Sequence, residues 1–272
     1  MEILLPLSRG EMFLFKLHSP NDFIVGGGFF VKFSRLPVSL AWASFGNKNG
    51  VDSRPEFLTR VSKYRKGEVG PDPTIGNIIL AQPFWFERQD WIPIPRDWSK
   101  NIVVGKSYDA LDATGYGLWA DVQARLGNPV GRHQIREGER RYGRAEVDVR
   151  LGQGAFRVLV TDAYDRRCAM TGENTLPVLE AAHIRPYSDD GPHCIDNGLL
   201  LRSDMHILFD KGLLTLTPEL RWEVSGEIRQ QYANGKLYYG YHGQELRSMP
   251  KTQNEQPSRE FLEWHNNNIF LP

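Results

Sequence analysis

The sequence predicts an α+β protein with a β-rich front half and a smaller mixed unit behind it. Short apolar and aromatic runs, broken by Gly and Pro, fill about the first 106 residues. A densely charged stretch follows, and after it a helical repeat of apolar residues leads into a strand, turn and helix pattern. A chain of 272 residues with 40 % hydrophobic residues can bury two cores. We therefore expect domains over 1–125 and 151–272, joined by a charged linker over 126–150.

The front half is expected to consist mainly of strands. Runs rich in apolar and aromatic residues and bounded by Gly or Pro are typical of strands. Such runs occupy 11–18, 26–33, 75–86 and 91–95. Between them, Val38–Phe45 fits a short helix for which Ser39 is available as the N-terminal cap. Many short strands with turn signals favour a small barrel or a sandwich.

Helices are expected on both sides of the charged stretch. Helical spacing fits 109–124, and apolar residues at helical spacing predict a second helix over Gly154–Tyr164 that enters the second domain. The stretch 132–150 between them alternates arginines with acidic residues. It fits a solvated mixed-charge linker and a segment lying on DNA equally well, and Arg144 and Arg150 are its candidate contacts to the DNA backbone.

Composition excludes several classes of protein. The only two cysteines, Cys168 and Cys194, cannot supply a disulfide-rich scaffold or a four-cysteine zinc site, so reduced thiols are expected. The 33 basic and 33 acidic residues balance, which is not the total of a protein that coats nucleic acid, although a local basic patch can still bind DNA. No apolar stretch is long enough to cross a bilayer, and the segment Met1–Pro6 lacks the basic start of a signal peptide. We expect a cytoplasmic protein with no membrane partner.

The residues that carry chemistry gather between about Cys168 and Leu216. His183 falls near the end of an expected strand, and a polar Gly/Pro turn follows it. A return segment carries Asn197, and an expected helix presents His206 and Asp210. The last two are spaced i, i+4, so they share one helix face and can converge on a single ion.

This set of residue types suits phosphodiester hydrolysis. The reaction needs a deprotonated water, neutralised charge on the phosphorane and a stabilised leaving oxygen. The imidazole of His183 is a suitable base, and a divalent ion suits the other two tasks. Asn197 can tie the two arms of the hairpin together and hold His183 in its attacking orientation.

The order His183, Asn197, His206 resembles the HNH, or ββα-metal, endonucleases. The likeness covers about Gln153–Leu216, with Ala-Ala-His-Ile around His183, Asn-Gly-Leu after the turn, and His-Ile-Leu-Phe-Asp-Lys-Gly from His206. It implies that His183 is the general base, that Asn197 orients the hairpin and that His206 binds a divalent metal ion. Mg²⁺ is the expected ion, with Mn²⁺, Co²⁺ or Ni²⁺ as alternatives.

The chain departs from the family pattern at two places. Many relatives place an acidic or histidine ligand directly before the base, where this chain has Ala182. Asp210 and Glu180 are therefore the candidates for the remaining metal ligands beside His206. Thr171 stands where many relatives have the second cysteine of a zinc-binding pair, so no structural zinc is expected.

The front half resembles the EVE domain, a PUA-like β-barrel found fused to HNH nucleases in modification-dependent restriction enzymes. The likeness covers about Gly10–Tyr108, from Gly10–Pro20 through the glycine turn at 26–28 to Val38–Trp42. It implies that a flipped 5-methylcytosine or 5-hydroxymethylcytosine sits in an aromatic cage. The glycines would let the backbone approach that ligand. The candidate base-binding residues are Trp42, Trp85, Phe15, His18, Ser19 and Phe29.

Together the two resemblances imply a bacterial restriction-type endonuclease acting on double-stranded DNA that contains modified cytosine. Arg185 joins the candidate DNA-backbone contacts, and a homodimer would bring together two nicking centres. Two alternatives stay open. The front domain could read sequence or bind DNA non-specifically, or the protein could be a DNA reader with a degenerate nuclease, which Ala182 favours. The other histidines in the second half and linker are expected to be structural, namely His133, His193, His242 and His265, the last by packing back on the nuclease core.

Overall fold

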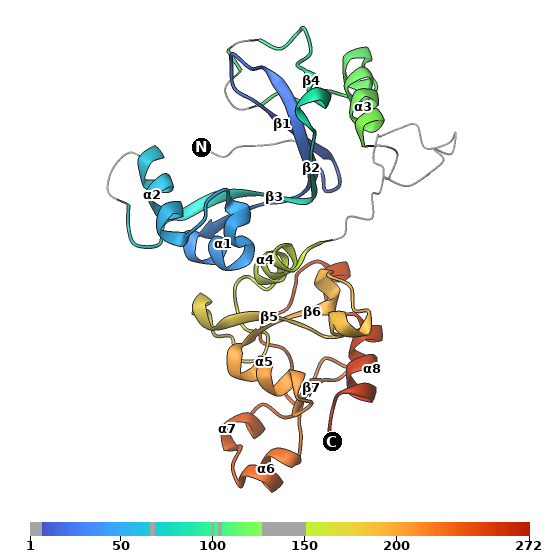
Figure 1. Ribbon diagram of the computed structural model, residues 1–272. Helices are drawn as coiled ribbons and strands as arrows, with labels where there is room; N and C mark the ends of the chain where they lie inside the picture. Colours follow the sequence, from blue (N-terminus) through green and yellow to red (C-terminus); the bar gives the residue numbers. More distant parts are fainter. Residues whose placement is uncertain (1–6, 66–68, 100, 103–104, 127–150) are drawn as a thin grey trace, which may run out of the picture. The chain divides into compact units, whose positions relative to one another are not determined.

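The computed structural model describes residues 7–65, 69–99, 101–102, 105–126 and 151–272. Its contacts divide the chain into two compact units. The first comprises Met1–Phe33 and Ile78–Arg150, and the second comprises Ser34–Asn77 and Leu151–Pro272 (Figure 1). The boundary between the units therefore falls inside the front half, for which the sequence predicts one domain over 1–125. No helix in the described part of the chain is both long enough and apolar enough to span a membrane.

A four-stranded sheet organises the first unit, although the last residues of its second strand and the first residues of its third are assigned to the second unit. Strands β1 (Met12–Lys16), β2 (Phe23–Pro37) and β3 (Thr74–Trp85) lie in that order, and β4 (Ile92–Pro93) pairs with the start of β2. Strand β1 runs antiparallel to β2, with a bulge at the end of β1. The expected strands are thus confirmed. The described strands form an open sheet rather than the closed barrel that the sequence led us to expect, because no ladder joins its edges.

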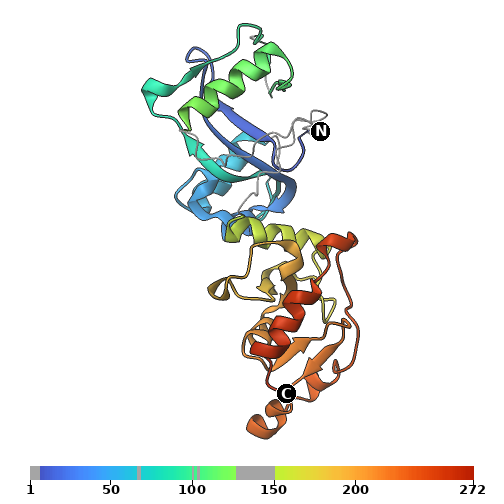
Figure 2. The same cartoon turned by 90° about the vertical axis from the view of Figure 1, so that its right-hand side faces the viewer.

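Helix α3 (Ala113–Arg125) packs on this sheet, where the sequence places a helix. Its Val122 is fully buried with Ile24 of β2 and Ile92 of β4. The second view shows α3 in front of the strands that it covers (Figure 2).

The glycines of β2 serve the sheet itself. A Cβ on Gly26 would lie 2.3 Å from the carbonyl oxygen of Phe84, and one on Gly27 would lie 2.5 Å from that of Phe13. Neighbouring strands thus approach too closely for any side chain. The expectation that these glycines admit a ligand is wrong, because β1 and β3 already occupy the space.

Two helices of the front half belong to the second unit. Helix α1 (Val38–Phe45) follows β2 directly, as expected, but Ser39 is not its cap. Its backbone N–H and hydroxyl both donate to the carboxylate of Asp72 instead. Helix α2 (Arg54–Tyr64) was not expected from the sequence, although its N-terminus carries a clear signal. Ser53 accepts a hydrogen bond from the backbone of Glu56, and Pro55 stands in the first turn.

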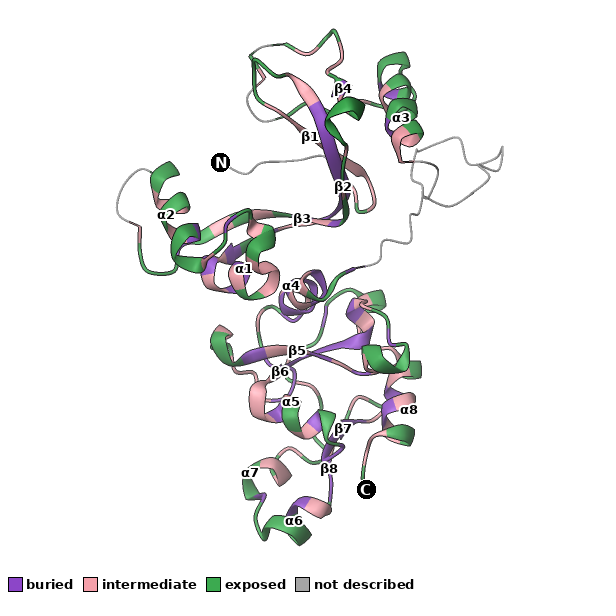
Figure 3. Ribbon diagram, in the orientation of Figure 1, coloured by how far each residue is buried: buried purple, intermediate pink, exposed green. Residues whose placement is uncertain are grey.

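The centre of the second unit is a hairpin between two helices. Helix α4 (Gln153–Ala163) confirms the expected helix, and it packs against both strands of the hairpin, β5 (Leu179–His183) and β6 (Gly198–Arg202). Helix α5 (Ser203–Asp210) begins where β6 ends and covers the same strands. The burial colouring shows β6 almost entirely buried, whereas β5 is buried in part and of intermediate exposure in part (Figure 3).

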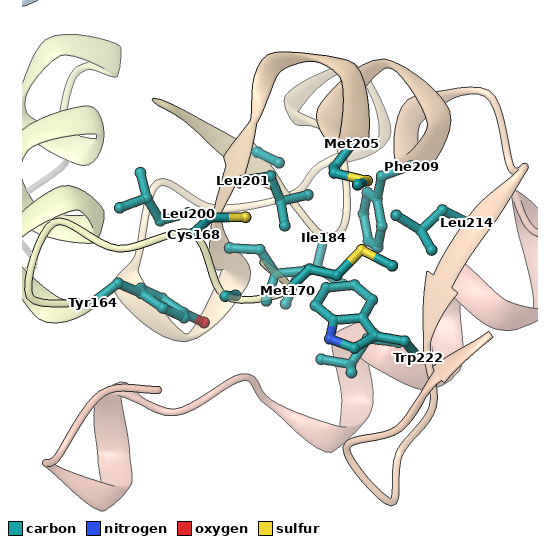
Figure 4. Close-up of a cluster of buried hydrophobic side chains, with 14 of the residues drawn as sticks. Tyr164, Cys168, Met170, Ile184, Leu200, Leu201, Met205, Phe209, Leu214 and Trp222 are labelled. Atoms are coloured by element: carbon teal, nitrogen blue, oxygen red, sulfur yellow. The ribbon is translucent and has the colours of Figure 1, made fainter. Parts of the chain in front are cut away.

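One apolar core holds the hairpin and the C-terminal elements together. Met170, Leu200, Met205, Phe209 and Trp222 are all 0–1 % exposed and meet in it (Figure 4). The C-terminal elements around this core are β7 (Leu214–Leu216), β8 (Trp222–Val224), α6 (Glu227–Tyr232), α7 (Lys236–Tyr239) and α8 (Arg259–Asn268). Short 3₁₀ turns lie at Gly46–Asn49, Arg88–Asp90, Leu176–Val178, Tyr187–Asp189, Ile195–Asn197 and Gln253–Glu255.

Candidate active site

The hairpin fixes where His183 stands. Strands β5 and β6 pair antiparallel from Leu179↔Arg202 to His183↔Gly198, so the histidine ends the ladder and faces the connecting loop. Gly198 is required there, because a Cβ would lie 2.5 Å from a methyl group of Val160 on α4. Helix α4 can therefore lie directly against the loop end of the hairpin.

Asn197 closes the loop that follows His183. Its side chain is fully buried. The amide oxygen accepts from the backbone N–H of Arg185 at 2.8 Å, and the amide nitrogen donates to the carbonyls of Arg185 at 3.0 Å and Pro192 at 2.9 Å. Its own carbonyl accepts from the N–H of Ile184 at 3.0 Å. Asn197 therefore holds the loop from inside the protein, where no phosphate can reach it.

His183 is held on two sides. Its ring stacks on Phe156 of α4, with centroids 3.9 Å apart and planes 12° apart. Its Nε2 lies 2.9 Å from Nδ1 of His193, a hydrogen-bond distance. Burial, helped by the neighbouring His193 and His206, lowers the pKa of His183 to about 4. The imidazole is therefore neutral at pH 7 and carries a lone pair that can accept a proton.

A second group of polar side chains lies between α5 and β5. His206 Nδ1 contacts Oε2 of Glu180 at 2.7 Å, and His206 Nε2 lies 3.3 Å from Oδ2 of Asp210. The pKa of Asp210 is raised above its ordinary value, mainly by burial. The positive form of His206 opposes this shift, and the charge of Glu180 adds to it. The structure thus brings the three candidate metal ligands together around one imidazole.

The donor chemistry of this group fits a divalent ion. Two ligands each about 2.1 Å from one ion stand roughly 3 Å apart, close to the 3.3 Å between Asp210 Oδ2 and His206 Nε2. Glu180 contacts the other nitrogen of the ring, which is the usual place of a carboxylate that orients a metal-binding histidine. Across the described residues, no three His, Cys, Asp or Glu side chains are grouped so that they could hold a metal ion by themselves. Water or phosphate oxygens would have to complete the shell.

A cleft of about 480 Å³ joins the two groups. His183 borders it from the hairpin, and His206 and Asp210 border it from α5. Helix α4 contributes Gln153 and Arg157 to the wall. Sequence reasoning did not select Arg157. In the sequence, its position one helical turn after Gln153 was the available signal.

The structure does not assemble the expected base-binding residues into one cage. Trp42 lies on α1 in the second unit, whereas the other candidates lie in the first. Phe29 is 3 % exposed, so its ring is packed in protein and cannot stack on a base. Phe15 and the exposed Trp85 stack on each other with centroids 4.9 Å apart, which leaves no room for a base between them. His18 and Ser19 are exposed at the end of β1.

The remaining candidates have varied positions. Arg185 donates from Nε to the carbonyl of Asp189 at 2.6 Å, and its guanidinium lies 5.4 Å from the ring centroid of Trp264. Arg144, Arg150 and His133 lie outside the described residues.

The other histidines separate into two kinds. His265 is buried and stacks on Phe209, which confirms that it packs on the nuclease core. His193, which the sequence predicts to be structural, brings its imidazole to that of His183. A spacing of ten residues across an irregular loop gave no periodic signal for that contact.

Comparison with known proteins agrees with this geometry. Residues 168–217 match the family model described as HNH endonuclease. The chain contains an HNH endonuclease domain. This match supports a nuclease activity, and HNH nucleases typically depend on a divalent metal ion.

One solved structure with detectable similarity is titled "Modification dependent TagI restriction endonuclease". It is 22 % identical over 43 % of this chain and 37 % of that chain, with a TM-score of 0.30. This chain thus spans well under half the length of that protein. No curated protein matches the sequence.

Proposed function

We propose that the protein is a divalent-metal-dependent restriction endonuclease that cuts DNA containing 5-methylcytosine or 5-hydroxymethylcytosine. The HNH unit would cut the strand, and the first unit, as an EVE-type PUA-like reader, would hold the flipped base. The observation that carries the nuclease part is the shared cleft. The neutral imidazole of His183 and the His206–Asp210 pair border the same cavity.

The hydrolytic step follows from the residues around that cavity. A water between His183 and the phosphate gives its proton to the free nitrogen of the imidazole, and its oxygen forms the new bond to phosphorus. The bond from phosphorus to the leaving sugar oxygen breaks, and that oxygen takes a proton from solvent. Arg157 of α4 borders the cleft and would hold a nonbridging phosphate oxygen with its guanidinium.

The ion would be held by Asp210 and by Nε2 of His206, with Glu180 orienting the ring from Nδ1. A divalent ion at this place supplies charge neutralisation for the phosphorane and for the leaving oxygen. Mg²⁺ suits a site with few protein ligands and several oxygen ligands from water and phosphate. Mn²⁺, Co²⁺ and Ni²⁺ would fit the same nitrogen and oxygen donors.

The reader part is supported by the EVE resemblance of residues 10–108 and by aromatic surface on the first unit. Trp85 is 70 % exposed, and its ring is backed by Phe15 on one face. A backed, exposed indole is a suitable platform for stacking an extruded base. His18 and Ser19, exposed beyond β1, would contact the base edge or a phosphate.

The stacked pair Phe15 and Trp85 also favours a second candidate, a nuclease whose first unit binds DNA without reading a modification. Because Phe15 and Trp85 stack directly on each other, the described residues offer a one-sided platform rather than a two-walled slot. One-sided stacking is tolerant of base identity.

Plasmid cleavage tests the nuclease part. Full-length protein is incubated with supercoiled plasmid in Mg²⁺ or Mn²⁺, with EDTA and His206→Ala as negative reactions. We expect metal-dependent nicking or linearisation of the plasmid, and no cleavage in EDTA or with His206→Ala. Cleavage that persists in EDTA and in His206→Ala would contradict the metal site.

The modification is tested with the same plasmid carrying cytosine or 5-methylcytosine, followed by mobility shifts of matched duplexes in EDTA. We expect cleavage and tighter binding of modified DNA, and loss of that preference in Trp85→Ala. Equal cleavage and binding of both DNAs would leave the second candidate. Sedimentation of the protein on a two-site duplex tests the proposed homodimer, which predicts two chains per double-strand break.

A further inference from the structure

The loop between β5 and β6 carries a second histidine that the proposed step does not use. His193 lies ten residues after His183, and its Nδ1 is 2.9 Å from Nε2 of His183. The two rings are tilted by 56° with centroids 5.0 Å apart, so the contact is edge to edge and suits a hydrogen bond. Only one of the two nitrogens can carry the hydrogen, because two N–H groups or two lone pairs repel.

This pair is held rigidly from both ends. His183 stacks on Phe156, and His193 stacks on Tyr187 with centroids 4.7 Å apart and planes 5° apart. Asn197 binds the carbonyl of Pro192, the residue directly before His193. Both imidazoles therefore have their planes fixed by an aromatic neighbour, and the loop that carries the second is tied to the protein interior.

We propose that His193 is a positioning residue that fixes the tautomer of the general base His183. This inference rests on the proposed function of His183. If the hydrogen resides on Nε2 of His183 and is donated to Nδ1 of His193, the Nδ1 lone pair of His183 is free to accept a proton from water. The opposite arrangement puts the hydrogen of neutral His183 on Nδ1 and leaves no base.

The same contact stabilises the product of proton transfer. When His183 takes the proton of water on Nδ1, it becomes an imidazolium that donates from Nε2 to the lone pair of His193. This is the task that a carboxylate performs for the histidine of a catalytic triad. A neutral partner performs it without the desolvation cost of a buried charge, and His193 can pass a proton on to solvent from its own Nε2.

Two substitutions separate this role from simple loop packing. The amide of Asn ends where histidine has Nδ1, whereas the amide of Gln reaches the position of Nε2. His193→Asn therefore keeps an acceptor oxygen facing His183, and His193→Gln and His193→Ala do not. His242→Asn is the matched control, because His242 is an exposed histidine that accepts from the backbone N–H of Val224 at 3.2 Å, far along the chain from the cleft residues.

The first measurement needs neither DNA nor metal. Long-range ¹H–¹⁵N correlation spectra of the full-length protein with ¹⁵N-labelled histidine report which ring nitrogen carries hydrogen, with His183→Gln assigning the signal. We expect His183 to be the Nε2–H tautomer in the wild type and in His193→Asn, and to lose that preference in His193→Ala. An Nδ1–H tautomer in the wild type, or the same spectrum in His193→Ala, overturns the proposal.

The second measurement is single-turnover cleavage with saturating enzyme, alongside DNA affinity in EDTA. We expect His193→Ala and His193→Gln to slow the chemical step by about 10–100-fold with unchanged affinity, and His193→Asn and His242→Asn to stay within a few-fold of the wild type. Equal loss in Asn, Gln and Ala variants overturns the positioning role. A wild type that never cleaves DNA defeats the proposed function instead, and the tautomer spectra then decide the His183–His193 contact alone.

Discussion

Two histidines of the second unit sit in nearly the same aromatic setting and have different neighbours. His183 stacks on Phe156 with centroids 3.9 Å apart, and His265 stacks on Phe209 with centroids 3.8 Å apart. Burial lowers the pKa of each to about 4. Stacking and a depressed pKa therefore do not distinguish a candidate base from a packing residue.

The difference lies in what the ring nitrogens meet. Both nitrogens of His265 have buried partners, the hydroxyl of Thr215 at 2.8 Å and the carbonyl of Phe209 at 3.2 Å. Nε2 of His183 contacts the imidazole of His193, the ring of His183 borders the cleft, and its Nδ1 makes no hydrogen bond to the described residues. The comparison teaches that a free nitrogen at a cleft, rather than a shifted pKa, marks the reactive histidine.

The sharpest test of this contrast is the pair His183→Ala and His265→Ala in the cleavage reaction. Removing a general base costs about 10²–10⁴-fold in rate, so we expect His183→Ala to be nearly inactive in single-turnover cleavage. Folded His265→Ala should cleave within a few-fold of the wild type. Normal cleavage by His183→Ala would show that the base is another group.

For stability we expect the opposite order, with the larger loss in His265→Ala and the smaller loss in His183→Ala. His265→Ala removes a buried ring and leaves the buried hydroxyl of Thr215 without its partner, which should lower the free energy of unfolding by about 3 kcal/mol. His183→Ala should cost less, because its ring is only partly buried. Urea unfolding monitored by circular dichroism measures both, with the exposed His18→Ala as control. Equal losses for both variants would remove the distinction.

Acid should destabilise the second unit through His265. Its pKa is about 4 when folded because burial disfavours the charged ring, against about 6.5 in an unfolded chain. The unfolded chain therefore binds the proton first. The free energy of unfolding is complete above pH 6.5 and falls as the pH drops towards 4, by about 3 kcal/mol from this residue.

His265→Asn isolates that contribution, since its amide can keep the bond to Thr215 and does not titrate. Urea unfolding at pH 7.5, 5.5 and 4.5 should show a shallower loss for this variant than for the wild type. Parallel curves would assign the acid sensitivity to other groups, with His183 the next candidate because its pKa is shifted in the same direction.

The smallest expected effect concerns the two stacking partners. Phe156→Leu and Phe209→Leu keep apolar volume but remove the ring face, and each should cost about 1 kcal/mol of stability. Phe156→Leu should also slow cleavage several-fold, because His183 loses the surface that sets its plane. Phe209→Leu should leave the rate within about two-fold of the wild type. If both variants slowed cleavage equally, the stack under His183 would have no special role.

The nuclease hairpin could be predicted from sequence because its information is local. His183, Asn197 and His206 occur in one stretch with regular strand and helix patterns, and the i, i+4 spacing of His206 and Asp210 predicts their convergence. His193 could not be selected in this way, because its contact depends on the path of an irregular loop. Phe29 illustrates the opposite error, since an aromatic residue in a strand looks the same whether it faces a ligand or a core.

The division of the chain into two units also could not be predicted from local sequence patterns. Helix α1 follows β2 in sequence but packs on α4, more than a hundred residues later. A Cβ on Gly154 would lie 2.1 Å from the carbonyl oxygen of Ser44, so this glycine is what permits the close crossing. A lone glycine near a helix start gives no indication of which distant helix it admits.

The burial of the Asn197 amide also affects how fast the protein is chemically degraded. Asn followed by Gly, as at positions 197 and 198, is the dipeptide most prone to succinimide formation and deamidation when the backbone is free to bend. In the fold this side chain is sealed from water and bonded at both its oxygen and its nitrogen, so the reaction has to wait for local opening. An aspartate formed there would turn a carboxylate without N–H groups towards two carbonyl oxygens, and the loop carrying the candidate base and its partner could not close again. The amide of Asn197 is therefore protected from deamidation only while the loop between β5 and β6 stays folded.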